Sequence, residues 1–104
     1  MTLYEQAVKK WGNASQLLQT IEECSELIKA IVKMLNREGS ITDVIEEAVD
    51  VQLMLNQLRA MLPSDDWQRF RSEKTAYLRE LLASQAEQFA KENPDYYKEV
   101  SDEH

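Results

Sequence analysis

The sequence predicts an all-α protein that folds as a compact helical bundle of about four helices. The 104 residues include only 2 glycines and 2 prolines, the residue types that most disfavour helices. Apolar residues recur at helical spacing, and no segment shows the apolar–polar alternation of strands. With 43% hydrophobic and 30% charged residues, the composition suits a soluble globular protein with a single domain, expected over residues 1–104.

The first helix is expected over residues 3–11 and ends at Gly12, a residue suited to a C-terminal cap. Asn13 or Ser15 can cap the second helix, expected from about residue 14 to residue 36. Apolar side chains cover more than half of the second helix, which predicts packing on two sides. They are Leu17, Ile21, Cys24, Leu27, Ile28, Ala30, Ile31, Val32, Met34 and Leu35.

The third helix is expected over residues 41–62, with a capping box of Ser40 and Asp43 at its start and Pro63 after its end. Two apolar rows run along it: Val44, Ala48, Val51, Leu55, Leu58 and Leu62 in one, and Ile45, Val49 and Leu53 in the other. A fourth helix is expected over residues 65–91. Because two helices carry apolar surface on two sides, we expect a homodimer or homotetramer that completes the bundle.

Charge, hydropathy and cysteine content exclude several classes of partner. A net charge of −7 leaves no basic surplus for nucleic-acid binding. No apolar run approaches the roughly 20 residues of a membrane span, so no membrane partner is expected, and the N-terminus lacks a signal-peptide pattern. The single cysteine, Cys24, excludes an internal disulfide, lies on the apolar stripe as a core residue and fits a reducing cytoplasm.

Two carboxylate pairs, Glu23-x-x-Glu26 and Glu47-x-x-Asp50, are set into the apolar pattern of the second and third helices. Residues three apart share a helix face, so pairs on consecutive helices joined by a short turn can converge. Glu23 and Glu47 each interrupt apolar rows on both sides. A buried carboxylate without a partner is costly, so such positions are solvated, paired or metal-bound, and periodicity alone leaves all three open.

The ligand types restrict the metal that such a site would hold. Carboxylate oxygens select hard cations, Mg²⁺ with Mn²⁺ as a substitute. The one histidine is His104, the last residue, which argues against di-iron and zinc chemistry and against a serine or cysteine nucleophile paired with histidine. Glu22, Lys29 and Lys33 lie opposite the apolar stripe and are interpreted as a solvated face.

The segments WGNASQLLQTIEECSELIKAIVK and VIEEAVDVQLMLNQL resemble the all-α nucleoside triphosphate pyrophosphohydrolases of the MazG-like superfamily, most closely its small phage and bacterial single-domain members. The resemblance spans roughly residues 3–82. The family signature, Glu-x-x-Glu followed after a helix and turn by Glu-x-x-Asp, is matched together with an upstream Trp-Gly…Gln segment. The matching residues are Glu23, Glu26, Glu47 and Asp50, with Trp11, Gly12 and Gln16 upstream.

The resemblance implies Mg²⁺-dependent hydrolysis of a ribo- or deoxyribonucleoside triphosphate to the monophosphate and pyrophosphate, in a bacterial or phage-infected cytoplasm. Glu23, Glu26, Glu47 and Asp50 would hold the metal and act in catalysis, with water attacking the α-phosphorus. The resemblance divides the chain into metal- and nucleotide-binding helices at 1–62, a packing and oligomerisation helix at 63–92 and a tail at 93–104.

Candidates for substrate contact lie outside the four acids. Members of this type often carry Lys-x-x-Arg-Leu in the helix after the metal-binding pair, and this chain has Tyr77 in place of the arginine. Lys74 and Arg79 stay candidates for phosphate contact, with solvated helix charges as the alternative. Trp11 either stacks on a base or packs in the core beside Leu3 and Val8. The remaining candidates are Gln16 and Asn56 for the base or sugar, and Lys29.

Two alternatives to nucleotide hydrolysis stay open at this point. A non-catalytic helical interaction or regulatory module that keeps the fold would explain Tyr77 and the lack of a clear basic clamp. A hydrolase of another pyrophosphate-linked metabolite would use the same carboxylates.

Overall fold

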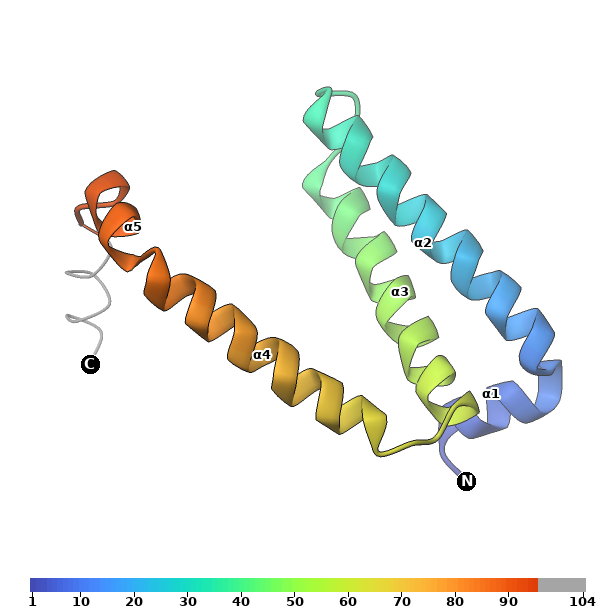
Figure 1. Ribbon diagram of the computed structural model, residues 1–104. Helices are drawn as coiled ribbons and strands as arrows, with labels where there is room; N and C mark the ends of the chain where they lie inside the picture. The colour runs from blue at the N-terminus through green and yellow to red at the C-terminus, as the bar shows by residue number, and fades with distance from the viewer. Residues whose placement is uncertain (96–104) are drawn as a thin grey trace. The chain divides into compact units, whose positions relative to one another are not determined.

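The computed structural model describes residues 1–95, which form five α-helices and no strand, so the all-α prediction is confirmed (Figure 1). The chain divides into two compact units, residues 1–64 and residues 65 onward. The single domain expected over residues 1–104 stays a prediction. Most of the predicted tail, from residue 96 on, lies outside the described residues.

The first unit contains α1 (Leu3–Trp11), α2 (Asn13–Leu35) and α3 (Ile41–Met61), close to the three expected ranges. Helices α2 and α3 form an antiparallel hairpin, and α1 lies at the end of the hairpin where α2 begins and α3 ends (Figure 1). The hairpin brings the two predicted acidic segments onto neighbouring helices.

The join between α1 and α2 is a single residue. Gly12 adopts φ 87°, a left-handed conformation that favours glycine, and its N–H donates to the carbonyl of Val8 at 2.8 Å. The prediction that Asn13 or Ser15 caps α2 is wrong, because the chain turns so sharply at Gly12 that Asn13 is already the first helical residue. No side chain caps this end of α2.

The predicted capping box at the start of α3 is confirmed. The backbone N–H of Asp43 donates to Ser40 Oγ at 3.1 Å, and the backbone N–H of Ser40 donates to Asp43 Oδ2 at 3.2 Å. At Gly39, a Cβ would lie 3.1 Å from the Cβ of Lys33, so the turn approaches α2 closely. These contacts fix where α3 begins relative to α2.

We expect Ser40→Ala to lower the free energy of unfolding by about 1 kcal/mol, because it leaves a backbone N–H of the first turn of α3 without its acceptor. Urea denaturation measures the change, with exposed Thr42→Ala in the same turn as the control. Equal losses in the two variants would show that the capping box does not fix this helix end.

Few side chains of this unit are buried. Ala30 and Met54 are the buried hydrophobic residues, and Gln16 is the buried polar one, within the part of the chain that the structure describes. Cys24, predicted in the core, is partly buried. Large apolar side chains of the hairpin stay exposed; they include Ile21, Ile28, Val32 and Leu35 on α2, and Ile45, Val49, Leu53 and Leu55 on α3.

The second unit contains α4 (Asp66–Ser84) and α5 (Ala86–Glu92). The single helix predicted over 65–91 is therefore wrong, because the chain leaves helical geometry at Gln85. There Ser84 Oγ donates to the carbonyl of Leu81 at 2.9 Å, a local bond of the kind that competes with helix continuation. Asp66 begins α4 and accepts from Arg69 Nη2 at 2.6 Å.

Candidate functional site

Three of the four predicted acids come together across the α2–α3 hairpin. Glu23 of α2 and Glu47 and Asp50 of α3 each place a carboxylate oxygen within 4.8 Å of the other two. All three side chains are partly buried. The three residues form what we call the acid cluster.

The acid cluster is built by helix spacing. Glu47 and Asp50 are three residues apart and therefore share the face of α3 that also carries buried Met54. On α2, Gln19 Nε2 donates to Glu23 Oε1 at 2.7 Å across one helical turn. This bond orients the Glu23 carboxylate and occupies one of its two oxygens. Sequence reasoning missed Gln19, although a glutamine four residues before an acid is a spacing that favours such a bond.

Glu26, the fourth predicted acid, lies outside the group of three. It accepts from Lys29 Nζ at 3.2 Å, and the two side chains are 44% and 62% exposed, so this ion pair contributes little stability. Glu26 is still near enough to raise the pKa of Glu47. Its part in metal binding stays a prediction.

The pKa of Glu47 is raised above its ordinary value of 4.5, first by partial burial and then by repulsion from other carboxylates. Those carboxylates are Asp50, Glu23, Glu26 and Glu46, in decreasing order of effect. None of the ion pairs within residues 1–95 includes a member of the acid cluster. Among the described residues, negative charge therefore gathers around Glu47 without a direct ion pair to any member of the acid cluster.

The raised pKa makes the stability of the metal-free protein depend on pH. The folded protein binds the Glu47 proton more tightly than the unfolded chain, so this group costs stability as pH rises from 4.5 through the raised pKa. With chelator present, we expect Glu47→Gln to have a higher Tm than the parent at pH 7, and the difference to shrink as pH falls towards 4.5. Thermal unfolding at several pH values measures this, with Glu22→Gln as the control because Glu22 is exposed and does not act on the pKa of Glu47. A difference that does not change with pH would contradict the expectation.

A groove of about 160 Å³ adjoins the acid cluster on the side of the α2–α3 turn. Its lining combines Glu47 with Glu26, Lys29, Ala30, Lys33, Asp43 and Glu46. Lys29, a predicted substrate contact, thus borders the groove that reaches Glu47. Lys29 and Lys33 are both exposed, as their interpretation as a solvated face expects, and they also line this groove.

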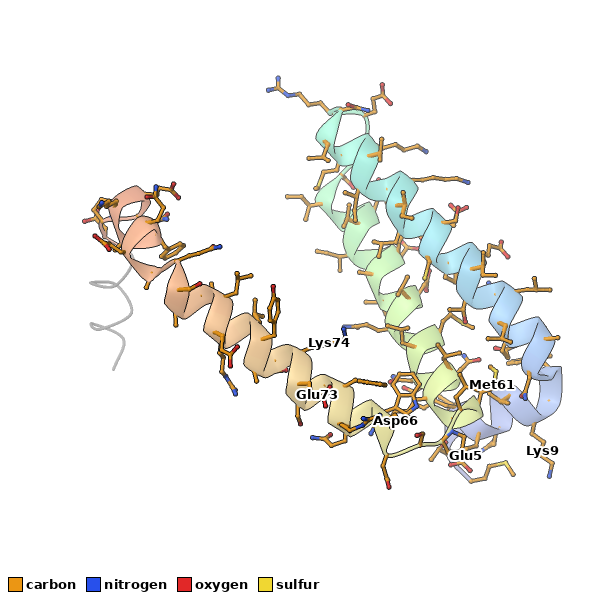
Figure 2. The ribbon with its side chains drawn as sticks, in the orientation of Figure 1. Glu5, Lys9, Met61, Asp66, Glu73 and Lys74 are labelled. Atoms are coloured by element: carbon orange, nitrogen blue, oxygen red, sulfur yellow. The ribbon has the colours of Figure 1, made fainter. Side chains whose placement is uncertain are left out.

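None of the other predicted substrate residues is a member of the acid cluster. Trp11 is 57% exposed, so its alternative placement in the core is wrong; a short helix at the end of the hairpin offers too few neighbours to cover an indole. Gln16 is 6% exposed on α2, and Asn56 is exposed on α3. Lys74 and Arg79 belong to α4 of the second unit, where both are exposed and Figure 2 labels Lys74 beside Glu73.

The donor set of the acid cluster has the chemistry of a divalent-cation site. Oxygen ligands from three carboxylates suit Mg²⁺ or Mn²⁺, and a cation there would relieve the repulsion that raises the pKa of Glu47.

No helix within residues 1–95 is both long and apolar enough to span a membrane. No protein-family model, no curated protein and no solved structure matches this chain. Assignment of a function therefore rests on the residues and geometry above.

Proposed function

We propose that this chain is a Mg²⁺-dependent nucleoside triphosphate pyrophosphohydrolase of MazG-like type, acting in a bacterial or phage-infected cytoplasm. It converts a ribo- or deoxyribonucleoside triphosphate into the monophosphate and pyrophosphate. The observation that carries the proposal is the convergence of Glu23, Glu47 and Asp50 from two helices. The resemblance of the flanking sequence supplies the substrate class.

The proposed metal ligands are the acid cluster, with Glu26 as a fourth acid. Mg²⁺ is commonly held by one or two protein carboxylates together with waters and substrate phosphates, so partly exposed carboxylates suit it better than a closed cage. The ion pair between Glu26 and Lys29 is exposed and costs little to break, which leaves Glu26 free to join the site. Mn²⁺ is the expected substitute.

When bound, Mg²⁺ supplies charge neutralisation for the triphosphate and lowers the pKa of a coordinated water. The side chains of this chain do the rest. Gln19 fixes the Glu23 carboxylate, and Lys29 and Lys33 place positive charge beside the groove, where phosphate oxygens outside the acid cluster would lie. Water forms a bond to the α-phosphorus, the bond from that phosphorus to the bridging oxygen breaks, and pyrophosphate leaves. The proton lost by the water passes to a carboxylate of the acid cluster.

We also propose that the protein is a homodimer or homotetramer. Residues 1–64 bury two hydrophobic side chains, Ala30 and Met54, while large aliphatic rows on both hairpin helices stay exposed. A chain of this length needs a larger buried core for stability. A second copy, which offers the same apolar rows, is the partner that covers them.

Hydrolysis in ¹⁸O-labelled water tests the proposed reaction. We expect one ¹⁸O atom in the nucleoside monophosphate and none in the pyrophosphate, because water attacks the α-phosphorus. Mass spectrometry of both products, with chelator as the control, locates the label. Label in pyrophosphate or in inorganic phosphate would place the attack at another phosphorus and contradict the proposal.

A further inference from the structure

The Glu23 carboxylate differs from the rest of the acid cluster because a neighbouring side chain holds it. Gln19 Nε2 donates to Glu23 Oε1 at 2.7 Å, and both side chains are partly buried. This length is at the short end of the range for hydrogen bonds to charged groups, which are the stronger ones. Within residues 1–95, the carboxylates of Glu47 and Asp50 accept no such bond. Glu23 is therefore the one acid of the cluster whose orientation is fixed by a side-chain donor among the described residues.

The hydrogen bond limits how Glu23 can hold a cation. A carboxylate binds a metal ion through one oxygen or through both, and the second mode requires both oxygens to face the ion. Because Oε1 of Glu23 faces Gln19 Nε2, turning both oxygens towards an ion would strain or break the hydrogen bond. Glu23 is therefore held in the mode that offers one oxygen.

Divalent cations differ in the mode that suits them. Mg²⁺ takes about six oxygens in a near-ideal octahedron and keeps several waters, so one oxygen from each carboxylate is enough. Ca²⁺ takes roughly six to eight oxygens in a flexible arrangement and is often held by both oxygens of a carboxylate. A site in which Glu23 offers one oxygen therefore suits Mg²⁺ better than Ca²⁺.

We infer that Gln19 is a positioning residue that raises the preference of the acid cluster for Mg²⁺ over Ca²⁺, by restricting Glu23 to one metal-binding oxygen. The inference deepens the proposed function and rests on it for the presence of a metal ion. A glutamine that only stabilised the charge of Glu23 would change the affinities for the two cations by the same factor. The ratio of the Mg²⁺ and Ca²⁺ affinities therefore carries the claim.

Metal affinities measured without nucleotide test this role separately from hydrolysis. The electron paramagnetic resonance signal of free Mn²⁺ falls as the ion binds, and competition with Mg²⁺ or Ca²⁺ gives the affinity for each. Gln19→Met removes the donor while keeping the length of the side chain and its helix propensity. We expect this variant to lose Mg²⁺ affinity about 10-fold while Ca²⁺ affinity stays or rises, so the ratio falls at least about 10-fold.

Two further variants accompany this test. Gln19→Ala also lacks the donor, favours helix and is expected to show the same fall in the ratio. Gln52→Met makes the matched change at an exposed position of α3 and should keep the parental ratio. Circular dichroism checks that the helicity of each variant equals that of the parent.

Three results would overturn the role of Gln19. They are a parental ratio in both Gln19 variants, an equal loss of affinity for both cations, and no binding of Mn²⁺ to the parent up to about 10 mM. A changed ratio without pyrophosphate release from any nucleotide would remove the proposed reaction and keep the role of Gln19. Pyrophosphate release with an unchanged ratio would remove the role of Gln19 alone.

Discussion

We expect a loss of at least ~100-fold in Mg²⁺-dependent pyrophosphate release from each of three variants, Glu23→Gln, Glu47→Gln and Asp50→Asn. Even the loss of a group that only supports a metal ligand lowers metal affinity or activity about 10–100-fold. Each change keeps the size of the side chain and removes one negative charge from the acid cluster. Helicity is expected to stay close to that of the parent, because all three side chains are only partly buried. Steady-state rates together with circular dichroism measure both effects.

Glu22→Gln is the matched control for these variants. It removes a carboxylate from the same helix, but the Glu22 side chain is exposed and lies outside the acid cluster. We expect this control to keep the parental rate. Parental activity in Glu23→Gln, Glu47→Gln or Asp50→Asn would remove that residue from the metal site, and loss of activity in Glu22→Gln would show that net charge, not position, matters.

Val49→Glu is expected to break the oligomer and with it the cooperative unfolding of the protein. Val49 is 46% exposed and lies in the α3 row with Ile45 and Leu53, which the proposed interface covers. A carboxylate placed there without a partner would be desolvated on assembly, which costs several kcal/mol. Sedimentation velocity at micromolar concentration should show a dimer or tetramer for the parent and a monomer for Val49→Glu, with a broad thermal transition.

Gln52→Glu serves as the control for Val49→Glu. It introduces the same charge on α3 at a position that is already polar and exposed, so assembly should persist. A parent protein that sediments as a monomer and unfolds cooperatively would contradict the oligomer, whatever the variants do.

Local chemical signals predicted most of the helix boundaries. The sequence alone indicates the start of α3 and the end of α1, because these boundaries depend on residues only a few positions apart. They are set by the capping box of Ser40 and Asp43 and by Gly12. The break between α4 and α5 was missed because Ser84 and Gln85 are compatible with a helix interior. At this break the Ser84 hydroxyl and the backbone N–H of Gln85 both donate to the carbonyl of Leu81, a local arrangement that the spacing of apolar residues does not indicate.

The acids of the candidate site were also accessible from sequence, because a carboxylate that interrupts an apolar row stands out. Periodicity placed Glu23 and Glu47 on inward faces, and the structure brings both together with Asp50. The supporting residue Gln19 was less accessible, because a glutamine on a helix is an ordinary polar position. Its spacing of four residues before Glu23 permits the bond to that carboxylate, but only the structure shows that the bond forms.

Pyrophosphate release from a panel of ribo- and deoxyribonucleoside triphosphates, with Mg²⁺ and with excess chelator, tests the proposed function most directly. We predict equal amounts of pyrophosphate and nucleoside monophosphate from at least one nucleotide with Mg²⁺, and neither product with chelator. Release only from other pyrophosphate-linked metabolites would contradict the substrate class. No pyrophosphate from any compound, together with no Mg²⁺-dependent rise in Tm, would contradict the enzyme and favour a non-catalytic helical module.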